Sequence, residues 1–189
     1  MCKTSSHIVD LIERLGRISR GARHADGMKP AQWEALRFLA NANKYSRTPG
    51  ALADFLSSTR GTVSQTLIAL EKKGLIVRTA SKGDGRVKQL ELTSEGRAIV
   101  VRDPLNTLED VLKGIDDKQG LAESLEKVLK GVIVQNGNHR FAACDGCRHF
   151  AMNVSPDNAK GPHRCMLSGE SLDSDDSVRI CREHEAHAA

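Results

Sequence analysis

The sequence contains few aromatic residues and no long apolar run. Phe, Trp and Tyr make up 3% of the 189 residues, so a core must be built mainly from Leu, Ile, Val and Ala. That composition favours packed helices over aromatic-rich sheets. No segment approaches the roughly 20 apolar residues that a membrane-spanning helix needs, and charges interrupt the apolar pattern of residues 1–17. We therefore expect a cytoplasmic protein with no membrane partner.

Catalytic signatures are also missing. The chain has no Gly-rich phosphate loop, and neither a Ser-His-Asp arrangement nor a pair of carboxylates stands out. We expect no catalytic residue and no enzymatic activity. A metal- or thiol-dependent enzyme centred on the C-terminal tail is the remote alternative, because cysteine is absent between Cys2 and Cys144 and four of the five cysteines lie in that tail.

Positive charge is concentrated in the N-terminal half. Residues 1–100 carry 17 Lys and Arg against 9 Asp and Glu, whereas residues 141–189 carry 5 against 8. This excess of positive charge can be an ordinary solvated surface, or it can be the surface that binds a polyanion such as DNA.

Apolar periodicity predicts a mainly helical chain with one hairpin. Helical spacing begins at Ser5 and is expected to last to about Arg23, with Gly27 ending the segment. Thr48 and Thr93 are expected to cap two later helices, the second of which is interrupted near Pro104. Two short β-prone runs around a basic tip predict a hairpin. The remaining helices are expected over residues 30–42, 61–74, 105–115 and 121–132, and the strands over 75–80 and 87–93.

Two short helices joined by a polar turn and followed by a basic hairpin are typical of a winged helix-turn-helix. In such proteins the second helix enters the major groove of double-stranded DNA, so its outer face needs hydrogen-bonding side chains while Val63, Leu67 and Leu70 pack inward. The alternative is an ordinary capped surface helix with no DNA contact. The residues expected to contact DNA from this helix and the turn before it are Ser58, Thr59, Arg60, Thr62, Ser64, Gln65 and Thr66.

The string LADFLSSTRGTVSQTLIALEKKGLIVRTASKGDGRVKQLELTSEG resembles the MarR family of bacterial winged-helix regulators. The Leu-Glu-x-x-Gly-Leu turn of that family runs from Leu70 to Leu75. The Asp-x-Arg motif of the wing is formed by Asp84 and Arg86, and the Leu-Thr-x-x-Gly motif after it ends at Gly96. The resemblance covers roughly residues 5–135. It implies a homodimer, in which the first and last helices interdigitate, on a pseudo-palindromic operator.

The wing has a physical interpretation of its own. Arg86 at the hairpin tip can enter a narrow minor groove, where the negative potential is enhanced, and Asp84 can orient its guanidinium. Lys82, Arg78 and Lys88 suit phosphate contacts. An Asp-Gly-Arg sequence is also common turn chemistry without any DNA role.

The tail carries Cys144, Cys147, Cys165 and Cys181, and we expect them to bind one metal centre. A two-residue gap in Cys-Asp-Gly-Cys lets both thiolates reach one ion, and disulfides are uncommon in the cytoplasm. The centre can be zinc, because histidines lie nearby and His163 or His184 could replace one thiolate ligand. It can equally be an iron–sulfur cluster, because the four thiolates are well separated in the sequence.

The sequence thus predicts a mainly α (α+β) fold: a winged helix-turn-helix with a helical dimerisation region and a small metal-binding segment. We expect a dimeric regulator whose DNA binding is modulated through the tail. The alternative is a regulator that responds to a small ligand or to thiol oxidation, with the tail as a structural zinc site. The expected parts are an N-terminal dimerisation helix (1–26), the DNA-binding domain (27–100), C-terminal dimerisation helices (101–137) and the cysteine-rich tail (138–189).

Overall fold

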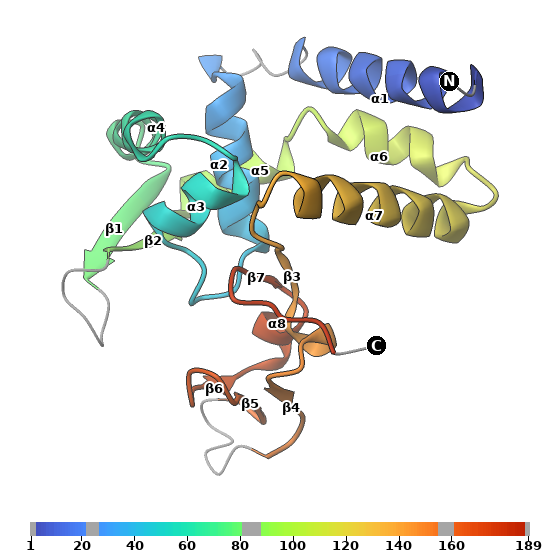
Figure 1. The fold of residues 1–189 in the computed structure, drawn as a ribbon. Coiled ribbons are helices and arrows are strands. Elements are labelled where there is room, and N and C mark those ends of the chain that lie inside the picture. The colour runs from blue at the N-terminus through green and yellow to red at the C-terminus, as the bar shows by residue number, and fades with distance from the viewer. Residues whose placement is uncertain (1–2, 22–26, 81–87, 155–160, 188–189) are drawn as a thin grey trace.

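The computed structural model describes residues 3–21, 27–80, 88–154 and 161–187 (Figure 1). Its central part is a winged helix-turn-helix. The helices are α2 (Pro30–Asn41), α3 (Pro49–Phe55) and α4 (Arg60–Lys72), and the hairpin strands are β1 (Ile76–Ala80) and β2 (Lys88–Leu92). The two strands pair antiparallel, with Ile76 opposite Leu92 and Ala80 opposite Lys88. The predicted helices and hairpin are therefore confirmed in this region.

Local capping explains where these helices begin. Thr48 accepts a hydrogen bond from the backbone N–H of Ala51, and Pro49 occupies the first helical position, where no backbone donor is needed. Thr93 caps α5 (Ser94–Val101) in the same way by accepting from the N–H of Gly96. The predicted caps at both threonines are confirmed.

The core of the winged helix is built mainly from aliphatic side chains, as the low aromatic content requires. Trp33, the single tryptophan, is fully buried in α2. The hairpin closes the core, since Ile76 and Leu90 are almost completely inaccessible to solvent. The other core side chains come from α2, α3 and α4: Leu36, Phe38, Leu39, Leu52, Val63, Leu67 and Leu70.

Three further helices extend away from the winged helix, on one side of it in Figure 1. They are α1 (Lys3–Gly21), α6 (Asn106–Lys113) and α7 (Lys118–Gln135). The first is described up to Gly21, and its predicted end near Arg23 lies outside the described residues. The expected break near Pro104 is present, because α5 ends at Val101 and α6 starts at Asn106. Within the described ranges, no helix has the length and apolar character needed to cross a membrane.

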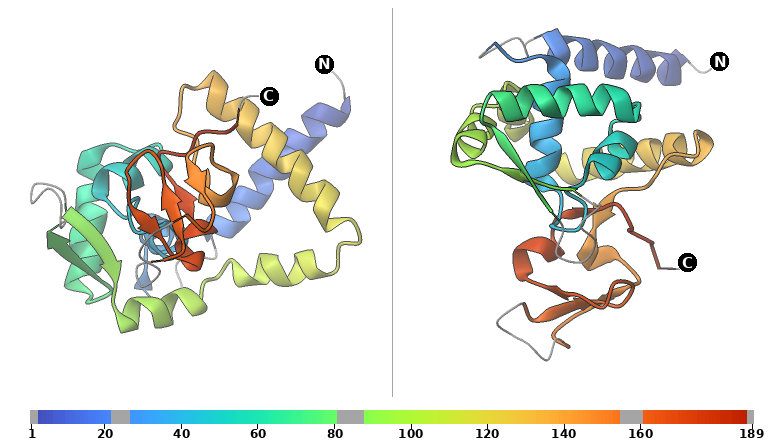
Figure 2. Two further views of the ribbon diagram at one scale, coloured as in Figure 1. Left: turned by 90° about the horizontal axis from the view of Figure 1, so that it is seen from below. Right: turned by 90° about the vertical axis from the view of Figure 1, so that its left-hand side faces the viewer.

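The tail forms a small separate layer of short elements against the winged helix (Figure 2). Strand β3 (Ala142–Ala143) pairs antiparallel with β7 (Ile180–Cys181). A second sheet consists of β4 (Phe150–Ala151), β5 (His163–Cys165) and β6 (Ser171–Leu172), with β5 in the middle. The remaining elements are η2 (Cys144–Gly146) and α8 (Ser174–Ser177).

Candidate nucleic-acid interface and cysteine cluster

Helix α4 has one buried and one polar face. Val63, Leu67 and Leu70 are at most 2% exposed and fix the helix on the core. Thr59 caps its first turn, since the Thr59 side chain accepts from the N–H of Thr62 at 3.1 Å. The outer face therefore begins at a capped, well-defined N-terminus, which is the part of a recognition helix that contacts base edges.

The predicted DNA-contacting side chains of α4 lie on this outer face. Arg60, Thr62 and Gln65 are exposed, as is Thr59, whereas Ser58, Ser64 and Thr66 are half-buried. Some hydroxyls are already used locally, because Thr66 Oγ1 donates to the carbonyl oxygen of Thr62 at 3.1 Å. The long side chains of Arg60 and Gln65 make no hydrogen bond to other described residues, so their donor groups are available to a binding partner.

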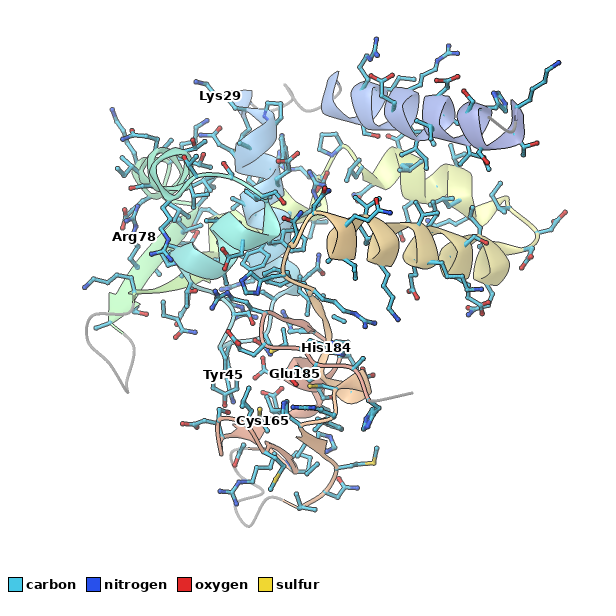
Figure 3. The ribbon with its side chains drawn as sticks, viewed as in Figure 1. Lys29, Tyr45, Arg78, Cys165, His184 and Glu185 are labelled. Atoms are coloured by element: carbon cyan, nitrogen blue, oxygen red, sulfur yellow. The ribbon has the colours of Figure 1, made fainter. Side chains whose placement is uncertain are left out.

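The wing is described only at its base. Lys82, Asp84 and Arg86 lie outside the described residues, so their predicted roles stay predictions. Lys88 is exposed at the start of β2. Arg78, labelled in Figure 3, is held against the protein instead of standing free, because its Nε lies 3.2 Å from Oε2 of Glu71 in the last turn of α4. Arg78 therefore ties the hairpin to α4, and its phosphate contact remains a prediction.

The four tail cysteines line one cavity of about 20 Å³. Cys144 and Cys147 stand on a tight turn, in which the N–H of Cys147 donates to the carbonyl oxygen of Cys144 at 2.9 Å. Sheet pairing brings the other two to the same place: Cys181 lies opposite Ala142, and Cys165 opposite Phe150. Residues far apart in the sequence thus line one cavity, and the metal centre predicted for them stays a prediction.

Two of these thiols are in direct contact. Cys144 donates a hydrogen bond to the sulfur of Cys181, which lowers the pKa of Cys181 and, together with burial, raises the pKa of Cys144. The contact therefore favours the thiolate form of Cys181 over that of Cys144, and the thiolate is the form that binds metals. In the described part of the chain, no three His, Cys, Asp or Glu side chains as they stand form a group that could hold a metal ion.

The histidines are placed differently from the prediction. His163 packs its ring against Phe150, and His184 is buried near Gly146, where burial lowers its pKa; neither lines the cavity. His149 does line it, as does Glu183. Figure 3 labels Cys165 and His184 at their positions in the tail.

A residue outside the tail also reaches the cysteines. Asn43, in the loop between α2 and α3, donates from Nδ2 to the Cys144 sulfur at 3.2 Å. The sequence contains no signal for this contact, because the two residues are separated by 101 positions. A loop asparagine ordinarily indicates only a turn.

Comparison with known proteins finds similarity in the central part of the chain. Residues 26–87 match the sequence profile of the MarR family. The HTH-type transcriptional regulator PapX of Escherichia coli is 32% identical over 78 residues, which are 41% of this chain and 48% of PapX. The chain thus spans about half the length of the curated relatives it matches.

Solved structures agree with the fold over a longer stretch. The transcriptional repressor CouR bound to a 23-mer DNA duplex is 29% identical, with a TM-score of 0.54 over 68% of this chain and 96% of CouR. CouR from Rhodococcus jostii RHA1 bound to p-coumaroyl-CoA gives a TM-score of 0.57 at 20% identity, over 70% of this chain and 95% of the other. These matches leave about 30% of this chain uncovered.

Proposed function

We propose that this chain, whose winged helix-turn-helix is of the MarR family, is a homodimeric transcription regulator that binds a pseudo-palindromic DNA operator. The observation that carries the proposal is the two-faced helix α4. Its buried face seats it on the core, and its exposed face offers Arg60 and Gln65 near a capped N-terminus. Arginine and glutamine are side chains that read guanine and adenine edges in the major groove. The DNA duplex bound to the related CouR supports this partner.

Substitution of Gln65 tests the DNA-binding face. The side chain is exposed, so Gln65→Ala should leave the fold intact. Loss of one bidentate base contact should weaken binding by about 1–3 kcal/mol. The measurement is a gel-shift titration at fixed salt on a duplex that the wild-type protein selects from a randomised pool. Gln119→Ala, on the distant helix α7, is the matched control and should bind as the wild type. Equal affinities for both variants would remove Gln65 from the interface.

A second copy of this chain is the proposed partner of the terminal helices. Along α1, Ile8, Leu11, Ile12, Leu15 and Ile18 are each more than 40% exposed, and along α7 the same holds for Leu125, Val128, Leu129 and Val132. Rows of apolar side chains of this extent are normally covered in an assembly. Multi-angle light scattering should give a dimer, and a well-behaved monomer would contradict this part of the proposal.

The tail is proposed to hold a single metal ion through its four thiolates, and the ion is proposed to modulate DNA binding. The cavity of about 20 Å³ is close to the space of one water molecule. The contact between Cys144 and Cys181 also suits one ion, because a tetrahedral zinc site with bonds of about 2.3 Å places its sulfurs roughly 3.8 Å apart. We propose zinc as this ion, with an iron–sulfur cluster as the alternative.

Metal analysis tests the thiolate centre. Anaerobically purified protein should contain close to one zinc per chain, and Cys165→Ser should lower that content because it removes one ligand. Cys2→Ser is the matched control, since Cys2 lies far from the tail in the sequence, and it should retain the metal. Protein with neither zinc nor iron would overturn the metal centre and leave the tail as a thiol switch.

A ligand-responsive regulator is the second candidate, supported by a cavity of about 630 Å³ between α7 and the tail. Its wall includes the apolar side chains of Leu129, Ile133, Phe141 and Ile180 together with the charged Lys130. This volume lies in the range of small-molecule sites. The fluorescent probe 1-anilinonaphthalene-8-sulfonate should bind here and be excluded by Ile133→Trp. Unchanged probe binding in that variant would argue against the cavity as a ligand site.

A further inference from the structure

Another cavity, of about 420 Å³, lies where α2, β2 and α5 meet the tail. Its volume is within the range of small-molecule sites. Three arginines from separate parts of the chain line it: Arg47 in the loop between α2 and α3, Arg97 in α5, and Arg179 between α8 and β7 (Figure 1). Like charges gathered in one cavity repel one another, so this arrangement favours the entry of a negative charge.

Each guanidinium is positioned by a hydrogen bond to a backbone carbonyl oxygen. Arg47 Nε donates to Ala42 at 3.0 Å, and Arg179 Nη1 donates to Ala40 at 2.5 Å, both at the end of α2. Arg97 Nη1 donates to the last carbonyl oxygen of β2 at 2.7 Å. A guanidinium carries further N–H donors in a planar fork. Among the residues that the structure describes, none of the three arginines forms an ion pair, so those further donors are available to a ligand.

The charged side chains of the cavity wall leave a positive excess. Among the described lining residues, Glu91 in β2 is the acidic one, so three positive charges and one negative charge give a net charge of +2. Asp176 also acts on Arg47, but its carboxylate lies 3.4 Å from Nζ of Lys44 and is balanced there. Burial lowers the pKa of Arg47, and the charge of Arg179 lowers it further. A bound anion would offset both unfavourable effects.

The rest of the wall is largely apolar. Leu39, Leu92 and Val100 line the cavity, and Leu39 belongs to the buried core of the winged helix. Small-molecule sites typically combine apolar walls with a few polar groups that fix the orientation of the ligand. The wall therefore favours an anion with an organic body over a bare inorganic ion.

We propose that this cavity binds a phosphate monoester with a small apolar body through Arg47, Arg97 and Arg179. A phosphate monoester carries a charge of about −1.5 to −2 near neutral pH, which matches the charge of the wall, whereas a monocarboxylate would balance only part of it. Phosphate oxygens also accept the paired N–H donors of guanidinium groups. Arg179 belongs to the tail and the other two to the winged helix, so the ligand joins both parts. The site uses neither the cysteines nor DNA.

Calorimetric titration of the full chain with phenyl phosphate tests the site. Phenyl phosphate should bind about tenfold or more tightly than benzoate, which has the same ring but offers fewer charged acceptors for the arginines. Inorganic phosphate should bind about tenfold or more weakly than phenyl phosphate, because it buries no apolar surface on the cavity wall.

Substitutions in the cavity locate the binding. Arg97→Met keeps the length of an exposed side chain and should weaken the binding of phenyl phosphate by about tenfold or more, as should Arg179→Met in the tail. Glu91→Gln should strengthen it by about twofold or more, because it removes the negative charge of the wall. Arg148→Met is the matched control: Arg148 is an exposed arginine of the tail that pairs with Glu185 outside the cavity, and the variant should bind as the wild type.

The outcomes that overturn the site are distinct from failures of the proposed function. Absence of phenyl phosphate binding overturns the site, and equal affinity for benzoate overturns the phosphate class. Unchanged affinity in Arg97→Met and Arg179→Met excludes this cavity. Weaker DNA binding by Arg97→Met, with unchanged phenyl phosphate binding, would assign Arg97 to the DNA backbone instead. If Arg179→Met releases the tail, Arg97→Met and Glu91→Gln decide, because both of those side chains are exposed. Zinc content and dimer mass are measured separately and do not depend on this result.

Discussion

Replacing Gly96 by alanine should destabilise the winged helix, although alanine is normally the better helix residue. Gly96 lies in the first turn of α5, where its backbone passes directly over the end of the turn that follows α4. A Cβ added there would overlap the carbonyl oxygen of Leu75 and lie 3.1 Å from its carbonyl carbon. That oxygen also accepts from the N–H of Thr93 at 3.1 Å, so it cannot move away freely.

The expected size follows from two opposing terms. Alanine gains about 1 kcal/mol over glycine in a helix, whereas forcing an extra methyl group into a packed site costs about 1–3 kcal/mol and occasionally more. The clash is with backbone, so the upper part of that range applies and Gly96→Ala should lose about 1–2 kcal/mol net.

A matched glycine gives the control. Gly50 lies in the first turn of α3, and a Cβ there would meet nothing within 4 Å. Gly50→Ala should therefore gain up to about 1 kcal/mol. Urea unfolding followed by the fluorescence of Trp33, the single and fully buried tryptophan, measures both variants. Stabilisation of the Gly96 variant equal to that of the Gly50 variant would refute the close approach of α5 to Leu75.

Thr59→Ala should destabilise the protein by about 0.5–2 kcal/mol through loss of the α4 cap, as measured in urea, and no change would mean that the cap contributes nothing. Leu67→Ala should cost about 2–5 kcal/mol in the same assay, because it opens a cavity under a fully buried side chain. Arg182→Met should remove the ion pair with Asp54 and increase hydrogen exchange in residues 40–47, whereas unchanged exchange would exclude it from tail docking. Arg86→Ala should weaken operator binding by about 1–3 kcal/mol with the fold intact, and unchanged affinity in a gel shift would remove the wing tip from the interface.

The winged helix could be predicted from the sequence because its signals are local. Thr48 and Thr93 cap helices within three residues of themselves, and Pro49 suits the first turn of a helix but not its interior. The period of the inward residues Val63, Leu67 and Leu70 marks the buried face of α4 without reference to any other part of the chain.

The tail could not be predicted in the same way. Its strands have two or three residues each, too few to show a period, and their pairing joins distant segments such as Ala142 and Cys181. The spacing of the cysteines predicted one shared metal centre; the four line a common cavity, and the centre itself stays a prediction, because no three His, Cys, Asp or Glu side chains of the described residues form a group that could hold a metal ion. Which histidine lies near the centre, and the contribution of Asn43, depend on how the tail docks on the winged helix. No local pattern encodes that docking.

The most direct test of the account is the sequence of the DNA that the purified full chain selects from a pool of randomised duplexes. A homodimer that presents two α4 helices should enrich inverted half-sites whose centres lie about one helical turn apart. A pool that remains random after repeated selection, or that enriches an isolated half-site with no inverted repeat, would contradict a dimeric operator-binding regulator.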